Sequence, residues 1–437
     1  MKRLSFQKIF CFLSFLFILS CCIFYGTRFV KLYLENHKTE IIEKNSLVKV
    51  LKENNINNEL FKSVNGINYF TGNDNTNYLL YANILWRIMK VNSDNSLTII
   101  SDKALTSLAY SKTDDYKNSE IYKWLNKTDK ELSGILENSL NTEYLVKTEA
   151  CYDKLDELSN NPCKETDTEN YISLLSIIDY LNIGSKDSYL ANNEYFYLSN
   201  MNTENKVWYI DDKGNGKLGT GNDIIGIRPV ITIKPNIDYI SGDGTIKKPY
   251  TIEKENSLFG SYVKLGNDIW RIYQINDNEI KLMLNDYLKV NGTALSYKYS
   301  NNNSYHNDTV NGSIAYYLNN TYYNSLSYKD KIKETKWSNG YYNSTTNFDY
   351  TNSLNEKIDT KIALMSIGDI FLNPELSNYF TMTGSANRSS SIYTISSNKR
   401  LFTKQVTTSI NIVPTISIDK NLLKKGNGTI DSPFEME

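Results

Sequence analysis

The second half of the chain repeats the first. The segment that begins at Tyr78 recurs from Tyr262, and each copy runs into a Trp-Arg-Ile triplet. Five further blocks match in the same order, pairing 121–126 with 314–319, 172–179 with 362–369, 195–199 with 379–383, 227–233 with 412–418, and 242–250 with 426–434. Chance does not preserve the order of so many blocks, and a unit this long is a whole domain rather than a solenoid repeat. We therefore expect a tandem duplication, with one repeat over 67–253 and the other over 259–437.

Each repeat is expected to contain strands and helices in a fixed order. A hairpin is predicted around Trp86, with its second strand at 96–101. The apolar spacing at 120–125 and 172–181 favours buried helices. Segments rich in β-branched and aromatic residues then predict strands at 195–199, 206–210 and 224–233. This order predicts an α+β domain, an antiparallel sheet with two inserted helices.

An uncharged segment precedes the repeats. Residues 9–27 carry no charged side chain, and as a helix they are long enough to cross the ~30 Å hydrocarbon core of a bilayer. Lys2, Arg3 and Lys8 precede the segment, which favours an N-terminus in the cytoplasm and a C-terminal part outside. We therefore expect residues 1–31 to form a cytoplasmic tip and a signal anchor in a bacterial cell membrane.

Two alternatives to the signal anchor stay open. Residues 18–21 resemble a lipobox, which would lipidate Cys21, and a cleaved signal peptide would leave no anchor. All three readings place the repeats outside the cytoplasm. After the anchor, residues 32–65 alternate charged and apolar positions without Gly or Pro, which predicts a helical stalk.

Two cysteines lie beyond the apolar segment, Cys151 and Cys163. In an oxidising compartment they are expected to pair, and closing a loop of this size stabilises a fold by about 3 kcal/mol. A reactive thiol is the alternative, although no nearby His or C-x-x-C spacing supports it.

Charge and histidine content limit the chemistry. The chain has 48 Lys+Arg against 49 Asp+Glu, so it lacks the basic excess typical of nucleic-acid binding. It has 2 histidines, and His37 lies next to the apolar segment, which leaves His306 alone. This excludes a His-rich zinc site, and no H-E-x-x-H or G-x-S-x-G motif is present. We expect no metal and no cofactor, and catalysis would have to use carboxylates or an unusual base.

Several motif-like features are interpreted as structural. Residues 214–219 match G-x-G-x-x-G in letters, but a strand follows where a nucleotide-binding loop needs a helix, so a hairpin loop is predicted. Trp86 and Trp270 lie inside apolar strands and are predicted core anchors. Arg228 precedes Pro229 in a strand, and we expect it to support a buried carboxylate or backbone carbonyls.

The motifs together resemble a known kind of module. The Trp-Arg-Ile strand, the Trp-Leu-Asn helix, the Ile-Arg-Pro-Val strand and the closing G-x-G-T-x-x-x-P-[YF] motif look like an uncharacterised bacterial extracellular module that often occurs in tandem. Its element order is similar to the C-type-lectin-like fold of formylglycine-generating enzymes and related lectin-like domains. The resemblance implies two such repeats. Neither repeat carries the calcium-sugar signatures of true C-type lectins or the cysteine-based site of formylglycine-generating enzymes, so those activities are not implied.

The leading functional hypothesis is a non-enzymatic surface protein that binds an extracellular glycan or protein, in an adhesion-type role. The predicted ligand-binding residues are aromatic residues of two strands, Tyr197, Trp208 and Tyr209. The Tyr/Asn/Ser-rich stretch 297–350 has the composition of a recognition surface, with a long solvated insertion as the alternative.

Two other classes of function stay open. An envelope-associated enzyme could use Asp179 and Asp369, carboxylates that recur at equivalent positions of the repeats. A purely structural surface spacer is the third hypothesis.

Overall fold

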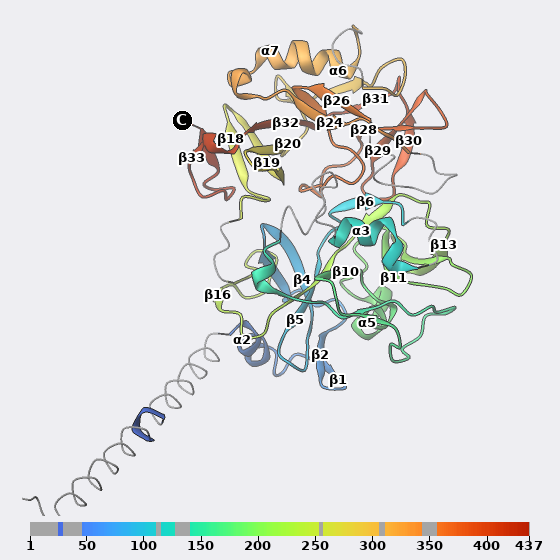
Figure 1. Cartoon of the computed structure of the whole chain (residues 1–437), viewed down its shortest axis with the longest axis vertical. Coiled ribbons are helices and arrows are strands. Elements are labelled where there is room, and N and C mark those ends of the chain that lie inside the picture. Colours follow the sequence, from blue (N-terminus) through green and yellow to red (C-terminus); the bar gives the residue numbers. More distant parts are fainter. Residues whose placement is uncertain are drawn as a thin grey trace, which may run out of the picture.

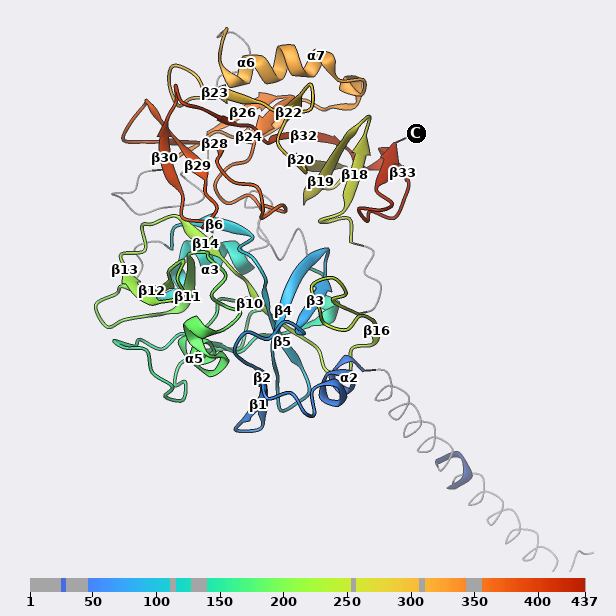
Figure 2. The same cartoon turned by 180° about the vertical axis from the view of Figure 1, so that it is seen from behind.

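The protein consists of two β-rich bodies that lie against each other (Figures 1 and 2). This computed structural model describes residues 25–28, 46–110, 115–126, 140–252, 257–305, 311–342 and 356–436. The first body, blue to green, contains the first repeat, and the second, yellow to red, contains the second repeat.

Each repeat contains a large and a small sheet. In the first repeat the large sheet has the order β10-β15-β5-β4-β3-β17-β16 and the small sheet has the order β13-β12-β11-β14-β6. The strands of the large sheet are β3 (Tyr78–Tyr81), β4 (Ile84–Val91), β5 (Leu97–Ser101), β10 (Ile172–Ser173), β15 (Val230–Ile233), β16 (Tyr239–Ser241) and β17 (Tyr250–Ile252). Those of the small sheet are β6 (Thr106–Leu108), β11 (Phe196–Met201), β12 (Val207–Ile210), β13 (Gly216–Gly219) and β14 (Ile225–Ile227).

The second repeat has the same two strand orders. Its large sheet runs β27-β32-β20-β19-β18-β34-β33, and its small sheet, written in the same direction as in the first repeat, runs β30-β29-β28-β31-β23. The parallel pairs fall at the same places, β17 with β3 and β34 with β18, and β11 with β14 and β28 with β31. The strands are β18 (Tyr262–Leu265), β19 (Asp268–Ile275), β20 (Glu279–Leu284), β23 (Ser296–Lys298), β27 (Ile362–Leu364), β28 (Tyr379–Ser385), β29 (Ser391–Ile395), β30 (Phe402–Gln405), β31 (Ser409–Asn411), β32 (Pro414–Asp419), β33 (Leu423–Lys425) and β34 (Phe434–Met436).

The hairpin predicted around Trp86 is confirmed as β4 and β5, and its counterpart in the second repeat is β19 and β20. Trp86 and Trp270 are completely buried in the core, as predicted. The indole of Trp86 also donates a hydrogen bond of 3.0 Å to the carbonyl of Tyr81.

The strand predicted over 224–233 divides between the two sheets. Its first part is β14 in the small sheet and its second part is β15 in the large sheet. Arg228 and Pro229 separate them, and because proline has no N–H it cannot continue the ladder of β14. Pro414 begins β32 at the corresponding place in the second repeat.

The predicted α+β class is wrong, because strands dominate the described residues and the helices are short. The α-helices of the described residues are α2 (Leu47–Asn54), α3 (Glu120–Asn126), α5 (Ile177–Ile183), α6 (Ile314–Tyr316) and α7 (Tyr323–Ser325), and a π-helical segment, Tyr317–Tyr322, joins α6 to α7 in one continuous helix. The helix at 120–125 is confirmed as α3, whereas the segment 172–181 begins as strand β10 and becomes helical only at Ile177. The error has a physical source, since periodicity alone does not separate a short buried strand from a buried helix.

The structure also corrects the membrane prediction. Among the described residues, no helix has both the length and the apolar character needed to cross a bilayer. The predicted signal anchor, and with it the single-pass location in a bacterial membrane, is therefore not supported by any helix in the described part of the chain. The predicted span 9–27 lies outside the described residues except for 25–27, and Cys21 lies outside them as well.

A helical stalk was predicted over 32–65. In the described part of this segment the structure has instead a short helix and a strand that pack on the first repeat. Residues 32–45 lie outside the described part of the chain. Helix α2 buries Leu47 and Leu51 completely, and the N–H of Leu47 donates to the carbonyl of Ile237 at 2.9 Å. Strand β1 (Phe61–Val64) pairs with β2 (Ile67–Phe70). Leu47, Val48 and Leu51, apolar positions of the predicted stalk, are thus core contacts, whereas Ile56 is 81% exposed.

Candidate functional site

A cleft of about 820 Å³ lies between the two repeats. Its volume falls in the range of ligand-binding pockets, and such pockets often form between domains. The hairpins β3–β4 and β18–β19, which belong to opposite repeats (Figure 2), both contribute residues to its lining.

The two repeats contribute equivalent residues to this cleft. In each repeat a tyrosine and an arginine are directly opposite on neighbouring strands, β3 and β4 or β18 and β19. An isoleucine from the closing G-x-G-T-I motif joins them. The pairs, each 184 residues apart, are Tyr78 with Tyr262, Arg87 with Arg271, and Ile246 with Ile430.

Arg87 is held on all sides by the first repeat. Its guanidinium carbon lies 3.9 Å from the ring centre of Tyr78 and 4.4 Å from that of Tyr189. Nε donates to Asn77 Oδ1 at 2.7 Å, Nη2 donates to the carbonyl of Asp74, and Nη1 lies 3.7 Å from Asp102 Oδ1. These contacts fix the rings of the two tyrosines at the cleft by cation–π attraction.

Arg271 connects the repeats. Its Nε donates to the carbonyl of Gly260 at 3.1 Å, and Nη1 donates to that of Leu372 at 2.6 Å. Nη2 donates to the carbonyl of Asn83, a residue of the first repeat, at 3.1 Å. The guanidinium carbon also lies 4.7 Å from the ring centre of Tyr262. Burial lowers the pKa of Arg271, yet an arginine stays charged, so the carbonyl dipoles around it offset its desolvation.

Other polar groups of the cleft also bind the protein itself. Asp74 Oδ1 accepts from the N–H of Thr76 at 2.7 Å. Asn83 Nδ2 donates to the carbonyl of Phe259 at 2.7 Å, and Asn192 Nδ2 donates to that of Asp102 at 2.8 Å. Much of the polar lining is therefore already hydrogen-bonded.

Main-chain hydrogen bonds cross from one repeat to the other. The N–H of Phe371 donates to the carbonyl of Leu105 at 2.7 Å, and both residues line the cleft. The indole of Trp124 donates to the carbonyl of Gly368 at 2.9 Å. These bonds join the two repeats, and the first of them lies at the cleft.

Two buried groups of opposite charge, Glu194 and Lys399, lie beside the cleft. Glu194 Oε2 accepts from the N–H of Ala104 at 2.8 Å, and Lys399 Nζ, from the second repeat, donates to the carbonyl of Pro374 at 3.0 Å. Burial raises the pKa of Glu194 and lowers the pKa of Lys399, while attraction between the two groups opposes both shifts. The pair belongs to the contact between the repeats.

Arg228 serves backbone carbonyls, as predicted. It is fully buried, with Nε donating to the carbonyl of Ser101 at 2.9 Å and Nη1 to that of Leu190 at 3.0 Å. It does not line the cleft.

The aromatic residues predicted to bind ligand are not at this cleft. Tyr197 is 1% exposed, and its hydroxyl donates to the carbonyl of Asp223 at 2.9 Å. Trp208 is buried and donates to the carbonyl of Leu155 at 2.7 Å, while Tyr209 is partly buried. The reason is that β11 and β12 lie inside the small sheet, where aromatic side chains fill the core.

The Tyr-rich stretch 297–350 also contributes to the core. Tyr299 and Tyr305 are completely buried, and the hydroxyl of Tyr305 donates to the carbonyl of Ile362 at 2.8 Å. His306 lies outside the described residues.

The two aspartates considered for an enzyme are paired within the protein. Asp179 Oδ1 lies 2.7 Å from Lys90 Nζ and accepts from the hydroxyl of Tyr69 at 3.0 Å. Asp369 accepts from the N–H of Ser366 at 2.7 Å, and burial raises the pKa of Asp369 to about 6. Neither residue lines the cleft.

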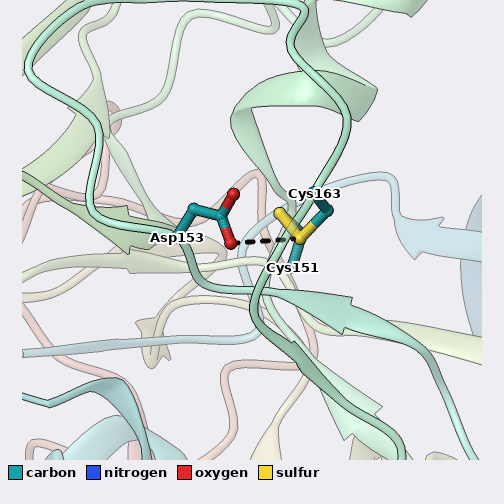
Figure 3. A group of neighbouring side chains, drawn as sticks. All are labelled: Cys151, Asp153 and Cys163. Atoms are coloured by element: carbon teal, nitrogen blue, oxygen red, sulfur yellow. Dashed lines mark hydrogen bonds between the residues drawn. A yellow bond between two sulfur atoms is a disulfide. The ribbon is translucent and has the colours of Figure 1, made fainter.

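Cys151 and Cys163 form a disulfide, with their Cα atoms 5.8 Å apart. Asp153 lies beside them, and Figure 3 shows its contact with the sulfur of Cys163. The three side chains have the spacing of a metal cluster, but sulfurs joined to each other are not thiolate ligands. The Asp153 carboxylate accepts instead from the N–H of Lys164 at 2.9 Å, so it orders the disulfide loop.

Residues 214–219 belong to a β-hairpin, as predicted, but only 214 and 215 lie in its turn, while 216–219 form its second strand. Strand β13 pairs with β12, and Gly214 takes a positive φ of 79° in the turn between them. The carboxylate of Asp211 accepts from the N–H groups of Lys213 and Asn215 at 3.0 and 2.7 Å, which completes the turn.

Comparison with known proteins gives no match to a family model, a curated protein or a solved structure. The resemblance to a tandem C-type-lectin-like module stays a prediction.

Proposed function

We propose that this is a non-catalytic binding protein that takes a glycan or protein ligand into the cleft between its repeats. The observation that carries the proposal is the cleft itself, of ligand size and lined by three matching residue pairs. Aromatic rings held by arginines give such a site rigid contact area at low entropic cost.

The positions of the carboxylates favour binding over catalysis. Asp179 is paired with Lys90, and Asp369 is capped by backbone, both away from the cleft. At the cleft, Asp74 is engaged by Thr76 and Asp102 lies close to Arg87.

The experiment is a screen of the full chain against a glycan array and a displayed random-peptide library. Any ligand found should lose affinity when charge is placed at the mouth of the cleft by Ile246→Asp or Ile430→Asp. Ile240→Asp is the matched control, because Ile240 is similarly exposed but lies outside the cleft. Ligands that bind both cleft variants as well as the control variant would refute the proposal.

A further inference from the structure

We infer that the ligand is a stretch of polypeptide with uncharged, apolar side chains, gripped by matching half-sites on the two repeats. This inference rests on the proposed function, because it names the ligand class of the same cleft.

The hydrogen bonds already made by the arginines and by Asn83 and Asn192 of the cleft favour a peptide over a glycan. A glycan presents hydroxyls, and its recognition requires polar side chains that are free to pair with them, because unpaired polar groups are costly to bury. Here the guanidinium groups of Arg87 and Arg271 bind carbonyls and the amide of Asn77. Asn83 and Asn192 donate to backbone carbonyls as well. These side chains have little capacity left for hydroxyls.

The charges of the cleft favour an uncharged ligand. Its acidic residues are Asp74, Asp102 and Glu375, and its basic residues are Arg87, Lys103 and Arg271. The two signs balance, and Arg87 lies 3.7 Å from Asp102. Charge complementarity therefore matches an uncharged segment rather than a phosphate or an acidic peptide.

The surface that remains for a ligand is aliphatic and aromatic. Leu80, Ile246 and Ile430 line the cleft and are 39%, 59% and 53% exposed. Large aliphatic side chains gathered at one exposed site are typical of a protein-binding surface, because covering them releases water. A peptide supplies the apolar side chains that can cover them.

Both repeats present the same contacts. Tyr78 with Ile246 forms one half-site, and Tyr262 with Ile430 forms the other. The half-sites are continuous with the contact between the repeats, where Leu105 and Phe371 are joined by a 2.7 Å hydrogen bond and also line the cleft. A segment lying in the cleft therefore touches both repeats at once.

The probe is a displayed library of random dodecapeptides, selected on the full chain and followed by affinity measurement with synthetic peptides. Selected peptides should carry at least two large apolar residues, and replacing these by serine should abolish binding. Tyr78→Ala and Tyr262→Ala should each weaken binding at least about tenfold, as expected for central aromatic contacts. Ile246→Asp and Ile430→Asp should do the same, while Ile240→Asp should retain the wild-type affinity. Thermal unfolding of each variant separates lost contacts from lost folding.

Other outcomes overturn the inference in distinguishable ways. If a glycan binds the wild type and its binding is lost in the same four variants, the inference that the ligand is a peptide is overturned, while the proposed function stands. Peptides sensitive to the variants of one repeat alone would overturn the paired half-sites. If no glycan or peptide depends on the cleft residues, the inference and the proposed function both fail.

Discussion

Arg271 Nη2 of the second repeat donates a hydrogen bond of 3.1 Å to the carbonyl of Asn83 in the first repeat. The side chain of Asn83 donates in return to the carbonyl of Phe259, at 2.7 Å. The turn between β3 and β4 is therefore tied in both directions to the start of the second repeat, directly at the wall of the cleft.

Replacing Arg271 should loosen this connection. Arg271→Ala leaves the carbonyls of Asn83, Gly260 and Leu372 without their buried donor, and the expected loss is about 3 kcal/mol of unfolding free energy. Urea unfolding measures the loss. Arg388→Ala is the comparison, because Arg388 is an exposed arginine of the same repeat and its replacement should cost less than about 1 kcal/mol. Equal losses in the two variants would contradict the role given to Arg271.

Gly260 tests the same contact by steric means. Gly260 has φ +71°, and a Cβ there would lie 2.7 Å from the Cβ of Asn83. Gly292 has φ +80° with nothing within 4 Å of an added Cβ, so Gly292→Ala carries only the backbone strain. Gly260→Ala should therefore destabilise by about 1–2 kcal/mol more than Gly292→Ala in chemical unfolding. Similar values for both would mean that the repeats do not touch at Asn83.

Asp369 should make stability depend on pH. Burial raises the pKa of its carboxyl to about 6, above its value of about 4 in an unfolded chain, so the folded protein binds the proton more tightly. The stability that Asp369 gains from binding this proton is fully present below about pH 4 and is lost as the pH rises through about 6. Between about pH 4 and pH 6 the unfolding free energy of the wild type should fall by about 3 kcal/mol relative to that of Asp369→Asn. Above about pH 6 the difference between the two proteins should stay constant. Parallel stability curves for the two proteins would show that folding does not raise the pKa of Asp369.

The disulfide should stabilise the first repeat. Reducing the Cys151–Cys163 bond with dithiothreitol should lower the unfolding free energy by about 3 kcal/mol, because the unfolded chain gains entropy. The double variant Cys151→Ser with Cys163→Ser should start at the lower stability and be insensitive to the reductant. A wild type that does not respond to reduction would contradict the contribution assigned to this bond.

The sequence was informative where a pattern reflects local packing. Trp86 and Trp270 lie inside apolar segments at equivalent positions of the repeats. Because the neighbouring residues are apolar too, the indole is expected to be buried in the core. Cys151 and Cys163 form a disulfide, as predicted from two isolated cysteines in one loop. The run at 172–181 misled because an apolar stretch fits a buried strand as well as a helix.

The cleft residues were harder to find. Tyr78, Arg87 and Ile246 look in sequence like further strand and turn residues, and only the packing of one repeat on the other makes them a site. Their signal was present in the duplication, because the same three residue types recur 184 positions later. Tyr197 was misjudged because aromatic strand residues read the same whether they face a ligand or, as here, the core.

The most direct test of peptide binding between the repeats is a crystal structure of the full chain with a peptide selected from the library. We expect density for the peptide between Tyr78 and Tyr262, with its apolar side chains against Ile246 and Ile430. Peptide density on any other surface, or against one repeat only, would contradict this expectation.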